Sequence, residues 1–328
     1  MVKNIKEGTY MSKRNWIYGR NVVLTGCSTG MGKEVLLLLV KKYGCNVMGV
    51  ARNKAKLDEL KAELGDKFSY RRFNISSEQE WLDFAKELDE IGFKTDILIN
   101  NAGMIQPFGQ FDDMTSEQID KIMKTNLLSV IYGCKAMVPA IKKSQFGGIV
   151  NVASASAILP FGGESIYSTT KGGVWGFTES LAQELRGFGV SVSCVMPGPV
   201  KTDLYKAREG EEGGNKADSF VENIGITAAT AGKRIVKAMR KRKQRVITDG
   251  VARMMSFGMK LCPVLTTRIT ASLMKSVCGK VKSFEPIYKE QIDNADMLKQ
   301  RMKDRKKNIY NSLEEVPVDG PFKEDMGR

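Results

Sequence analysis

The stretch Asn21-Val-Val-Leu-Thr25-Gly-Cys-Ser-Thr-Gly-Met-Gly32, followed by Glu34-Val-Leu-Leu-Leu-Leu-Val-Lys-Lys42, decides the fold. It predicts a buried strand, a glycine turn and a helix, which is how a dinucleotide-binding α/β domain begins. Gly26, Gly30 and Gly32 would let a pyrophosphate approach bare backbone N–H groups, toward which the helix presents the positive end of its dipole. The spacing is G-x3-G-x-G rather than the commoner G-x-G-x-x-G. The alternative is a tight turn that binds nothing.

Ser154, Tyr167 and Lys171 form a second pattern further along the chain. Ser154 comes shortly after the apolar pair Ile149-Val150, so we expect it at the open end of a buried strand. The four-residue step from Tyr167 to Lys171 puts both side chains on one face of a helix. An ammonium that close favours the phenolate and should lower the pKa of the tyrosine from about 10. The plainer alternatives are a turn serine and a packed tyrosine, but a buried lysine without a role would be costly.

Together with Asn100-Asn-Ala-Gly103, Asn126 and Pro197-Gly198, these patterns resemble the short-chain dehydrogenase/reductase family. The resemblance covers roughly residues 18–250, and the motifs occur in the order typical of the family. It implies an α/β fold with a Rossmann-type doubly wound parallel sheet in a single domain, followed by a helical C-terminal extension. It also implies hydride transfer between a nicotinamide and the carbon of a carbonyl or secondary alcohol.

The resemblance further implies a role for each matching residue. Tyr167 would be the general acid in reduction and the base in oxidation, and Lys171 would lower its pKa and hold the nicotinamide ribose. Ser154, which the spacing to Tyr167 selects over Ser156, would bond the substrate oxygen as charge develops on it. Asn126 would help to place a water behind the lysine, although alone it would be interpreted as a helix residue bonded to backbone. The expected cofactor contacts are Gly26, Ser28, Thr29, Gly30, Met31, Gly32, Arg52, Asn74, Ile75, Asn101, Ala102, Gly103, Tyr167, Lys171, Pro197, Gly198, Val200 and Thr202.

The choice of nicotinamide should be made after the second strand, where the chain reads Ala51-Arg52-Asn53. Relatives that prefer NAD carry an acidic residue there, and this chain has none. The planar fork of an arginine suits a 2′-phosphate, so the sequence predicts NADP(H) in preference to NAD(H). The alternative is that Arg52 points into water. Asn74 stands where the family usually has Asp, and its amide still offers an acceptor and donors toward an adenine.

Composition excludes several other classes of site. The chain has 328 residues, 42% of them hydrophobic, which fits one domain with extensions. It has no histidine, so a Ser-His-Asp triad and most zinc sites are excluded and no metal is expected. The six cysteines show no CxxC spacing and are expected to be small buried hydrophobes in a reducing compartment. Neither a signal peptide nor a run of about 18 apolar residues is found, so a cytoplasmic location is expected.

Positive charge is concentrated toward the C-terminus. Residues 233–284 hold fourteen Lys/Arg and one acid, a net charge of +13. Residues 251–265 combine methionine, phenylalanine and leucine with scattered cations, which suits a peripheral contact with an anionic membrane. A lid over the substrate pocket, with the cations merely solvated, is an equal alternative; nucleic-acid binding is not expected, because no binding motif accompanies the charge. The predicted segments are a leader (1–17), the catalytic domain (18–250), a helical basic extension (251–314) with an amphipathic helix over 285–314, and a disordered tail (315–328).

The substrate is expected to be a bulky hydrophobic ketone or secondary alcohol. Apolar residues follow Ser154 and also follow Asn100-Asn-Ala-Gly103. From these segments, Phe161 and Met104 are expected to contact the substrate, together with Ser154 and Tyr167. The other expected walls are Ile105, Phe108, Ile158, Leu159 and Pro160, with the alternative that several are core residues. The acidic, glycine-rich stretch 209–215 is expected to be a lid tip or a solvated insertion.

Three functions remain open from the sequence. A hydroxysteroid dehydrogenase is the first, and a reductase of a 3-oxoacyl chain or long-chain keto-lipid is the second. A non-catalytic, cofactor-binding sensor or scaffold attached to a membrane is the third, and the presence of Ser154, Tyr167, Lys171 and Asn126 together argues against it. Family members are commonly dimers or tetramers, so a homo-oligomer is expected.

Overall fold

The computed structural model describes residues 16–107, 109–202 and 225–278, and the single positions 297, 300, 303 and 304. Several predictions made from the sequence lie outside these residues. They are the leader up to residue 15, Phe108, the stretch 209–215, the amphipathic helix over 285–314 apart from the single positions, and the tail.

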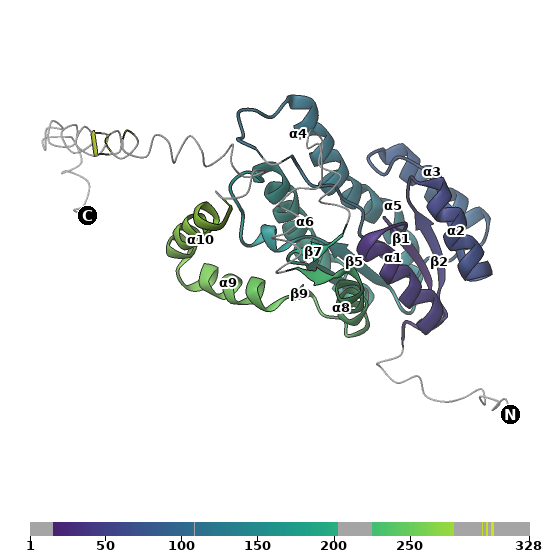
Figure 1. Cartoon of the computed structure of the whole chain (residues 1–328). Helices are drawn as coiled ribbons and strands as arrows, with labels where there is room; N and C mark the ends of the chain where they lie inside the picture. Colours follow the sequence, from purple (N-terminus) through teal and green to yellow (C-terminus); the bar gives the residue numbers. More distant parts are fainter. Residues whose placement is uncertain are drawn as a thin grey trace, which may run out of the picture.

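A seven-stranded parallel sheet forms the centre of the described part of the chain (Figure 1), with the strand order β3-β2-β1-β4-β5-β6-β9. The strands are β1 (Asn21–Thr25), β2 (Asn46–Val50), β3 (Phe68–Arg71), β4 (Ile97–Asn100), β5 (Gly148–Val152), β6 (Ser191–Met196) and β9 (Arg245–Ile247). A separate two-stranded pair joins β7 (Val200–Lys201) to β8 (Ile226–Thr227). The predicted doubly wound sheet is therefore confirmed, since β1 lies centrally and the chain winds outward on both sides of it.

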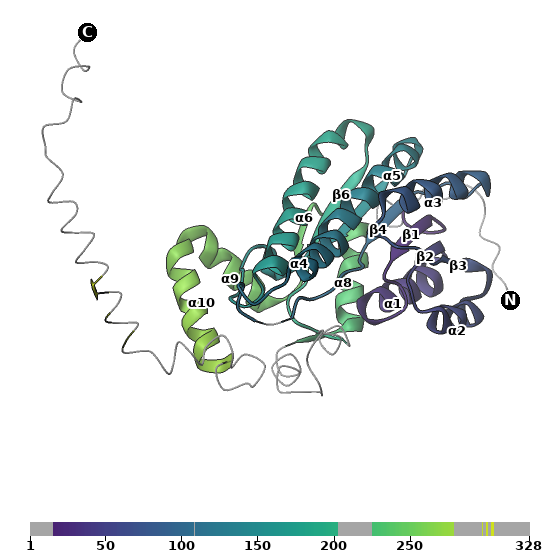
Figure 2. The ribbon, with the colours of Figure 1, turned by 90° about the horizontal axis from the view of Figure 1, so that it is seen from above.

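Helices cover both faces of this sheet. They are α1 (Gly30–Leu37), α2 (Lys54–Leu64), α3 (Glu78–Glu90), α5 (Ser129–Lys143), α6 (Ser165–Glu184) and α8 (Ala228–Arg240). α4 (Ser116–Met123) packs against α6, while α9 (Gly250–Leu261) and α10 (Pro263–Cys278) pack against each other. π-helical segments continue α1 over Leu38–Lys42 and α4 over Lys124–Leu128. Figure 2 shows α1, α2 and α8 on one face and α3, α5 and α6 on the other.

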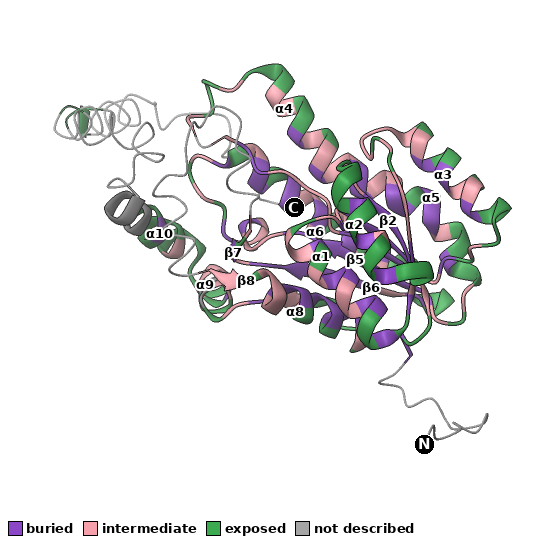
Figure 3. Ribbon diagram, turned by 45° about the vertical axis from the view of Figure 1, so that its right-hand side comes forward, coloured by how far each residue is buried: buried purple, intermediate pink, exposed green. Residues whose placement is uncertain are grey.

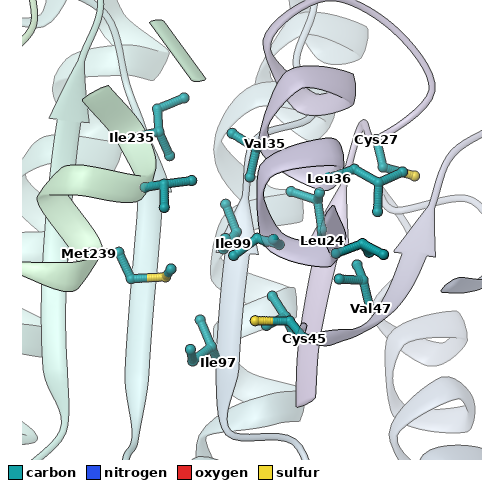
Figure 4. Close-up of a cluster of buried hydrophobic side chains, with 14 of the residues drawn as sticks. Leu24, Cys27, Val35, Leu36, Cys45, Val47, Ile97, Ile99, Ile235 and Met239 are labelled. Atoms are coloured by element: carbon teal, nitrogen blue, oxygen red, sulfur yellow. The ribbon is translucent and has the colours of Figure 1, made fainter. Parts of the chain in front are cut away.

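The alternation of side chains along each strand builds two cores, because successive residues of a strand point to opposite faces. On the first face, Leu24 and Ile99 pack with Val35 of α1 and Met239 of α8 (Figure 4). On the second face, the neighbouring strand residues Val23, Leu98 and Ile149 pack with Trp81 and Phe84 of α3. Figure 3 shows the central strands buried along most of their length, which is why they read as continuous apolar runs in the sequence. The edge strands β3 and β9 are more exposed.

The folded body begins earlier than the predicted boundary after residue 17. Trp16 and Ile17 are both buried in the first core. The indole N–H of Trp16 donates to the carbonyl of Arg240 (3.0 Å), and the Arg242 guanidinium lies 4.5 Å from the centre of its ring. These two residues therefore belong to the domain, where they connect its first strand to the end of α8.

The prediction for the cysteines holds for four of them and is wrong for one. Cys27, Cys45, Cys134 and Cys194 are buried, and Cys262 is exposed. Burial raises the pKa of Cys27, Cys134 and Cys194 to about 12, so these thiols stay protonated and unreactive. Cys262 differs because it lies at the junction of α9 and α10, where the chain turns at the surface.

Candidate functional site

The glycine turn and the Asn100–Gly103 motif lie side by side at the carboxyl ends of two neighbouring strands. β1 and β4 are neighbours, and their carboxyl ends lead into the glycine turn and into Asn101. The backbone N–H groups of Asn101 and Ala102 both donate to Thr25 Oγ1 (3.0 Å each). The Asn101 side-chain amide donates in return to the carbonyls of Thr25 (3.1 Å) and Gly26 (3.3 Å). Thr25, which the sequence analysis did not single out, thus joins the two segments at the crevice where α/β sheets bind dinucleotides.

The glycine turn is shaped so that only glycine fits. Gly26 and Gly30 have φ angles of +68° and +52°, in the left-handed region. A Cβ on Gly32 would lie 2.0 Å from the carbonyl oxygen of Gly26. The N-cap of α1, Thr29, makes no side-chain hydrogen bond to the helix, so the first-turn N–H groups are left open to a ligand. Asn101 Oδ1 is buried and has no hydrogen-bond partner among the described residues. These features fit a pyrophosphate on the helix N-terminus and a polar group beside Asn101.

Two arginines lie at the end of the second and third strands. Arg52 is exposed directly after β2, and its carbonyl accepts a hydrogen bond from Arg72 Nε (3.0 Å). Asn53 caps α2 by accepting from the backbone N–H of Lys56 (3.1 Å). Arg72 was not predicted, because it follows β3 and only the parallel pairing of β2 with β3 brings it beside Arg52.

Asn74 and Ile75 lie in the loop after β3, where the adenine contact was expected. Asn74 Oδ1 accepts from the backbone N–H of Ser76 (3.1 Å), while the exposed side chain keeps its amide donors. The Ile75 carbonyl accepts from the indole of Trp81 (3.0 Å). The loop is therefore held by its own residues, and the Asn74 side chain is exposed on it.

Tyr167 and Lys171 are buried side by side on α6. Lys171 Nζ lies 5.6 Å from the centre of the Tyr167 ring and donates to the Val152 carbonyl at the end of β5 (3.3 Å). Burial lowers the pKa of Lys171 from 10.5 to about 8. A Cβ on Gly103 would be 3.4 Å from Lys171 Nζ, so the glycine lets the loop after β4 approach the ammonium. An ammonium has three N–H donors, and the Val152 carbonyl accepts from one of them, so Lys171 can still donate to a ligand.

Ser154 lies at the end of β5, as the sequence predicted. It is half-buried and forms the N-cap of a short 3₁₀ turn, Ala155–Ala157. Its Oγ accepts from the backbone N–H of Ser156 (3.1 Å) and lies 3.2 Å from the Ser156 hydroxyl, which is buried. The geometry makes Ser154 the more accessible of the two serines.

Asn126 is fully buried in the π-helical segment after α4. Its Oδ1 accepts from the N–H of Met104 and its Nδ2 donates to the carbonyl of Met104, both at 2.8 Å. Nδ2 also lies 3.4 Å from Thr170 Oγ1 on α6. The side chain therefore bonds to backbone, as the plainer interpretation of the sequence expected, and it positions the loop that carries Met104.

Gln106 continues this loop and was not found from the sequence. It is fully buried, and its Oε1 accepts from the backbone N–H of Tyr167 (2.8 Å). Its Nε2 donates to the carbonyl of Gly163 (3.0 Å). An N–H in the first turn of a helix has no partner within the helix, and the Glu164 side chain does not cap these groups. Gln106 thus joins the loop after β4 to the start of α6. Its partners lie far along the chain, so no local pattern in the sequence marks it.

The segment that follows β6 lies over the glycine turn. A Cβ on Gly30 would be 3.2 Å from the methyl group of Thr202, and the Pro197 carbonyl accepts from the N–H of Ala155 (2.7 Å). Gly198 is close to Asp249, whose Oδ2 would be 2.2 Å from an added Cβ. Asp249 Oδ2 is buried and has no partner among the described residues, while Oδ1 caps α9. Asp249 was not predicted either, because only the fold places it against this loop.

The predicted apolar walls divide into two groups. Met104, Ile158 and Phe161 are half-buried, and Pro160 is exposed. Ile105 and Leu159 are buried, which is the core position that the sequence analysis gave as the alternative. Phe108 lies outside the described residues.

Comparison with known proteins identifies the family. The family model for short chain dehydrogenases matches residues 20–213. The chain is 34% identical to the 3-oxoacyl-[acyl-carrier-protein] reductase of Vibrio cholerae over 195 residues, which cover 59% of this chain and 79% of that protein. It is 32% identical to the 3-beta-hydroxysteroid dehydrogenase of Comamonas testosteroni over 196 residues, or 59% and 76% of the two chains.

A solved structure supports the same fold. A serine dehydrogenase in its closed form, complexed with NADP+, superposes with a TM-score of 0.64 at 23% identity and covers 70% of this chain and 95% of its own. The fold and the enzyme class predicted from the sequence are thereby confirmed. The chain belongs to the short-chain dehydrogenase family, and it is a nicotinamide-dependent oxidoreductase of alcohol and keto groups.

Proposed function

We propose that this protein reduces the ketone of a bulky hydrophobic substrate with NADPH and oxidises the corresponding alcohol with NADP+. The nicotinamide would supply or accept the hydride. The observation that carries the proposal is the buried pair Tyr167 and Lys171 on α6. Lys171 Nζ donates to the Val152 carbonyl, two residues before Ser154, and lies near Gly103 in the loop that Asn101 joins to the glycine turn. Gly26, Gly30, Gly32 and the uncapped start of α1 would hold the pyrophosphate.

The three residues divide the proton chemistry between them. Tyr167 would donate its phenolic proton to the substrate oxygen in reduction and take it back in oxidation. Lys171 would favour the phenolate by its charge and donate to the cofactor's ribose hydroxyls. Ser154 would donate its hydroxyl hydrogen to the substrate oxygen, which its half-buried position and its orienting bond from the Ser156 N–H support.

NADP(H) in preference to NAD(H) is proposed from the pair Arg52 and Arg72. Both guanidinium groups belong to residues at the end of adjacent strands, and bidentate arginine contacts suit a 2′-phosphate. The NADP+ complex of the serine dehydrogenase, a protein of the same fold, supports this choice. Replacing Arg52 with Ala should raise the KM for NADPH while leaving that for NADH nearly unchanged.

A hydroxysteroid is the first substrate candidate, and a 3-oxo group on a long acyl chain is the second. The half-buried apolar side chains of Met104, Ile158 and Phe161 support a hydrophobic substrate in either case. The 3-oxoacyl reductase among the relatives favours the second candidate, and the hydroxysteroid dehydrogenase favours the first. The two substrate candidates are distinguished by adding steroid ketones and 3-oxoacyl ketones separately. The consumption of NADPH and of NADH is measured by absorbance in each case. No turnover of either class of ketone would contradict the proposal of a hydrophobic substrate.

The central test of the mechanism is Tyr167→Phe. Loss of the phenolic proton should lower kcat by about 10²–10⁴-fold while NADPH still binds. Tyr132→Phe, on α5, is the matched control and should keep its turnover. A Tyr167→Phe variant with normal turnover would show that the acid–base assignment is wrong.

A cytoplasmic homo-oligomer with a peripheral membrane contact through the basic C-terminal segment completes the proposal. Among the helices of the described residues, none has the length and apolar composition needed to cross a bilayer. The charge of residues 233–284 supports a contact with an anionic surface.

A further inference from the structure

In the two helices after the domain, α9 and α10, large apolar side chains are exposed and two polar side chains are buried. Six large apolar side chains of this hairpin are between 56% and 68% exposed, while Ser256 and Thr270 are buried at 6% and 4%. The exposed residues are Met254, Phe257, Leu261, Val264, Leu265 and Ile269. We call them the apolar hairpin face. A helix pair that faced only water and the domain would show the opposite pattern, so this face is suited to an apolar partner.

The hairpin is a defined unit at one end of the molecule. α10 packs chiefly against α9, and a Cβ on Gly258 would lie 2.8 Å from Thr266 Oγ1, so the glycine allows the two helices to approach closely. The turn between them is held by the N–H of Thr266 donating to the Cys262 carbonyl (2.9 Å). Both views show the hairpin at the end of the molecule opposite α2 and α3 (Figure 1, Figure 2). Met254, Phe257 and Leu261 recur at helical spacing on one side of α9, and Leu265 and Ile269 lie one turn apart on α10, so each helix presents its apolar side chains as a group.

Charge decides which partner fits this face. Arg253, Lys260 and Arg268 are exposed on the same two helices, and the sequence holds no acidic residue over positions 250–284. A second copy of the hairpin docked on this face by two-fold symmetry would bring these cations against their like. Negatively charged lipid headgroups would instead neutralise them, while the acyl boundary below would receive the apolar side chains.

We infer that the apolar hairpin face is an interfacial anchor that lies flat on an anionic lipid bilayer. Met254, Phe257 and Leu261 enter the acyl boundary from α9, and Val264, Leu265 and Ile269 enter it from α10. The cations of the hairpin lie at the headgroup level. The inference rests on the membrane contact in the proposed function and names the surface that makes it. It is independent of the proposed reaction.

The test uses the full chain and two kinds of vesicle, one of phosphatidylcholine alone and one that also contains phosphatidylserine. Sedimentation with the anionic vesicles should exceed that with the neutral ones by about tenfold and fall with added salt. Phe257→Ser with Leu261→Ser should reduce binding to the anionic vesicles by about tenfold, and so should Lys260→Glu with Arg268→Glu. The matched controls are Leu82→Ser and Lys86→Glu, exposed positions on α3, and both should bind like the parent chain.

Three results would overturn the inference. One is equal or absent sedimentation with both kinds of vesicle. Another is a change from oligomer to monomer in the Phe257→Ser/Leu261→Ser variant without vesicle binding by the parent, which would make the face a contact between copies. The last is a changed KM for a small water-soluble ketone without vesicle binding, which would make the hairpin a pocket lid. Turnover of that ketone by the parent, measured without vesicles, tests the proposed reaction separately.

Discussion

The environment of Lys171 differs strongly from that of a free lysine side chain in water. Its ammonium is buried beside Tyr167, and burial lowers its pKa from 10.5 to about 8. Between those pH values the unfolded chain holds a proton on this group that the folded chain has released. The free energy of unfolding therefore rises with pH across this window, whereas below pH 8 both states are protonated and the full cost of the buried charge is present.

A comparison with Lys171→Met removes this titration while every other ionisable group stays in the chain. Without cofactor, the parent should gain on the order of 3 kcal/mol of stability relative to Lys171→Met as the pH rises from about 8 to about 10.5. Urea unfolding of both proteins at several pH values measures the difference. If the two stabilities change in parallel with pH, Lys171 does not carry the shifted titration.

Gln106 is the second residue that invites a test. Gln106→Leu removes the acceptor of the Tyr167 N–H and the donor to the Gly163 carbonyl. The free energy of unfolding should fall by about 1–3 kcal/mol. Because Gln106 does not touch the glycine turn in the described contacts, NADPH affinity should stay unchanged while kcat falls about tenfold through misplacement of Tyr167.

Two further variants distinguish positioning from simple destabilisation. Gln106→Glu keeps an acceptor at the start of α6, where a negative charge is favourable, and should recover part of kcat. Gln79→Leu, at an exposed position of α3, should leave kcat unchanged. A fall of kcat and of NADPH affinity by the same factor in Gln106→Leu would contradict a positioning role.

At the scale of elements, the glycine turn at the start of α1 is tightly constrained. Gly32→Ala would place a Cβ 2.0 Å from the Gly26 carbonyl, so either the turn or the helix must move. We expect a stability loss of about 1–3 kcal/mol and loss of NADPH binding, because the N–H groups of the turn would no longer converge on one anion.

Gly176→Ala is the matched control within a helix. Nothing lies within 4 Å of a Cβ at this exposed position of α6. The change should raise stability by roughly 0.5–1 kcal/mol through helix propensity and leave NADPH binding intact. Thermal unfolding and fluorescence titration with NADPH measure both variants, and normal NADPH binding by Gly32→Ala would refute the proposed fit.

At the scale of the whole molecule, Trp16 joins the start of the domain to its end. Trp16→Ala should cost about 3–5 kcal/mol, since it removes a buried indole, its bond to the Arg240 carbonyl and its contact with Arg242. Tyr18→Ala, where the side chain is 43% exposed, should cost less than half as much. Denaturant unfolding measures both, and equal losses would show that Trp16 does not hold the two parts together.

Much of the fold was predictable because its signals are local. Asn21–Thr25, Ile97–Asn100 and Gly148–Val152 are buried on both faces, so each reads as a continuous apolar run. The helix after the glycine turn was also predicted, but its change to π-helix at Leu38 was not, because no residue there marks it. The exposure of Cys262 was missed for a related reason: burial depends on which partners pack around a segment.

The sequence by itself determined the doubly wound sheet, the family and the spacing of Ser154, Tyr167 and Lys171, because strand periodicity, glycine turns and helix repeats act over a few residues. Only the tertiary structure decided what surrounds them. Thr25, Arg72, Gln106 and Asp249 lie far along the chain from the groups they contact, and strand order and helix packing bring them there. The exposure of the apolar side chains on α9 and α10 was likewise undecided, because an apolar stripe predicts burial and only the packing around a helix shows whether the stripe is covered.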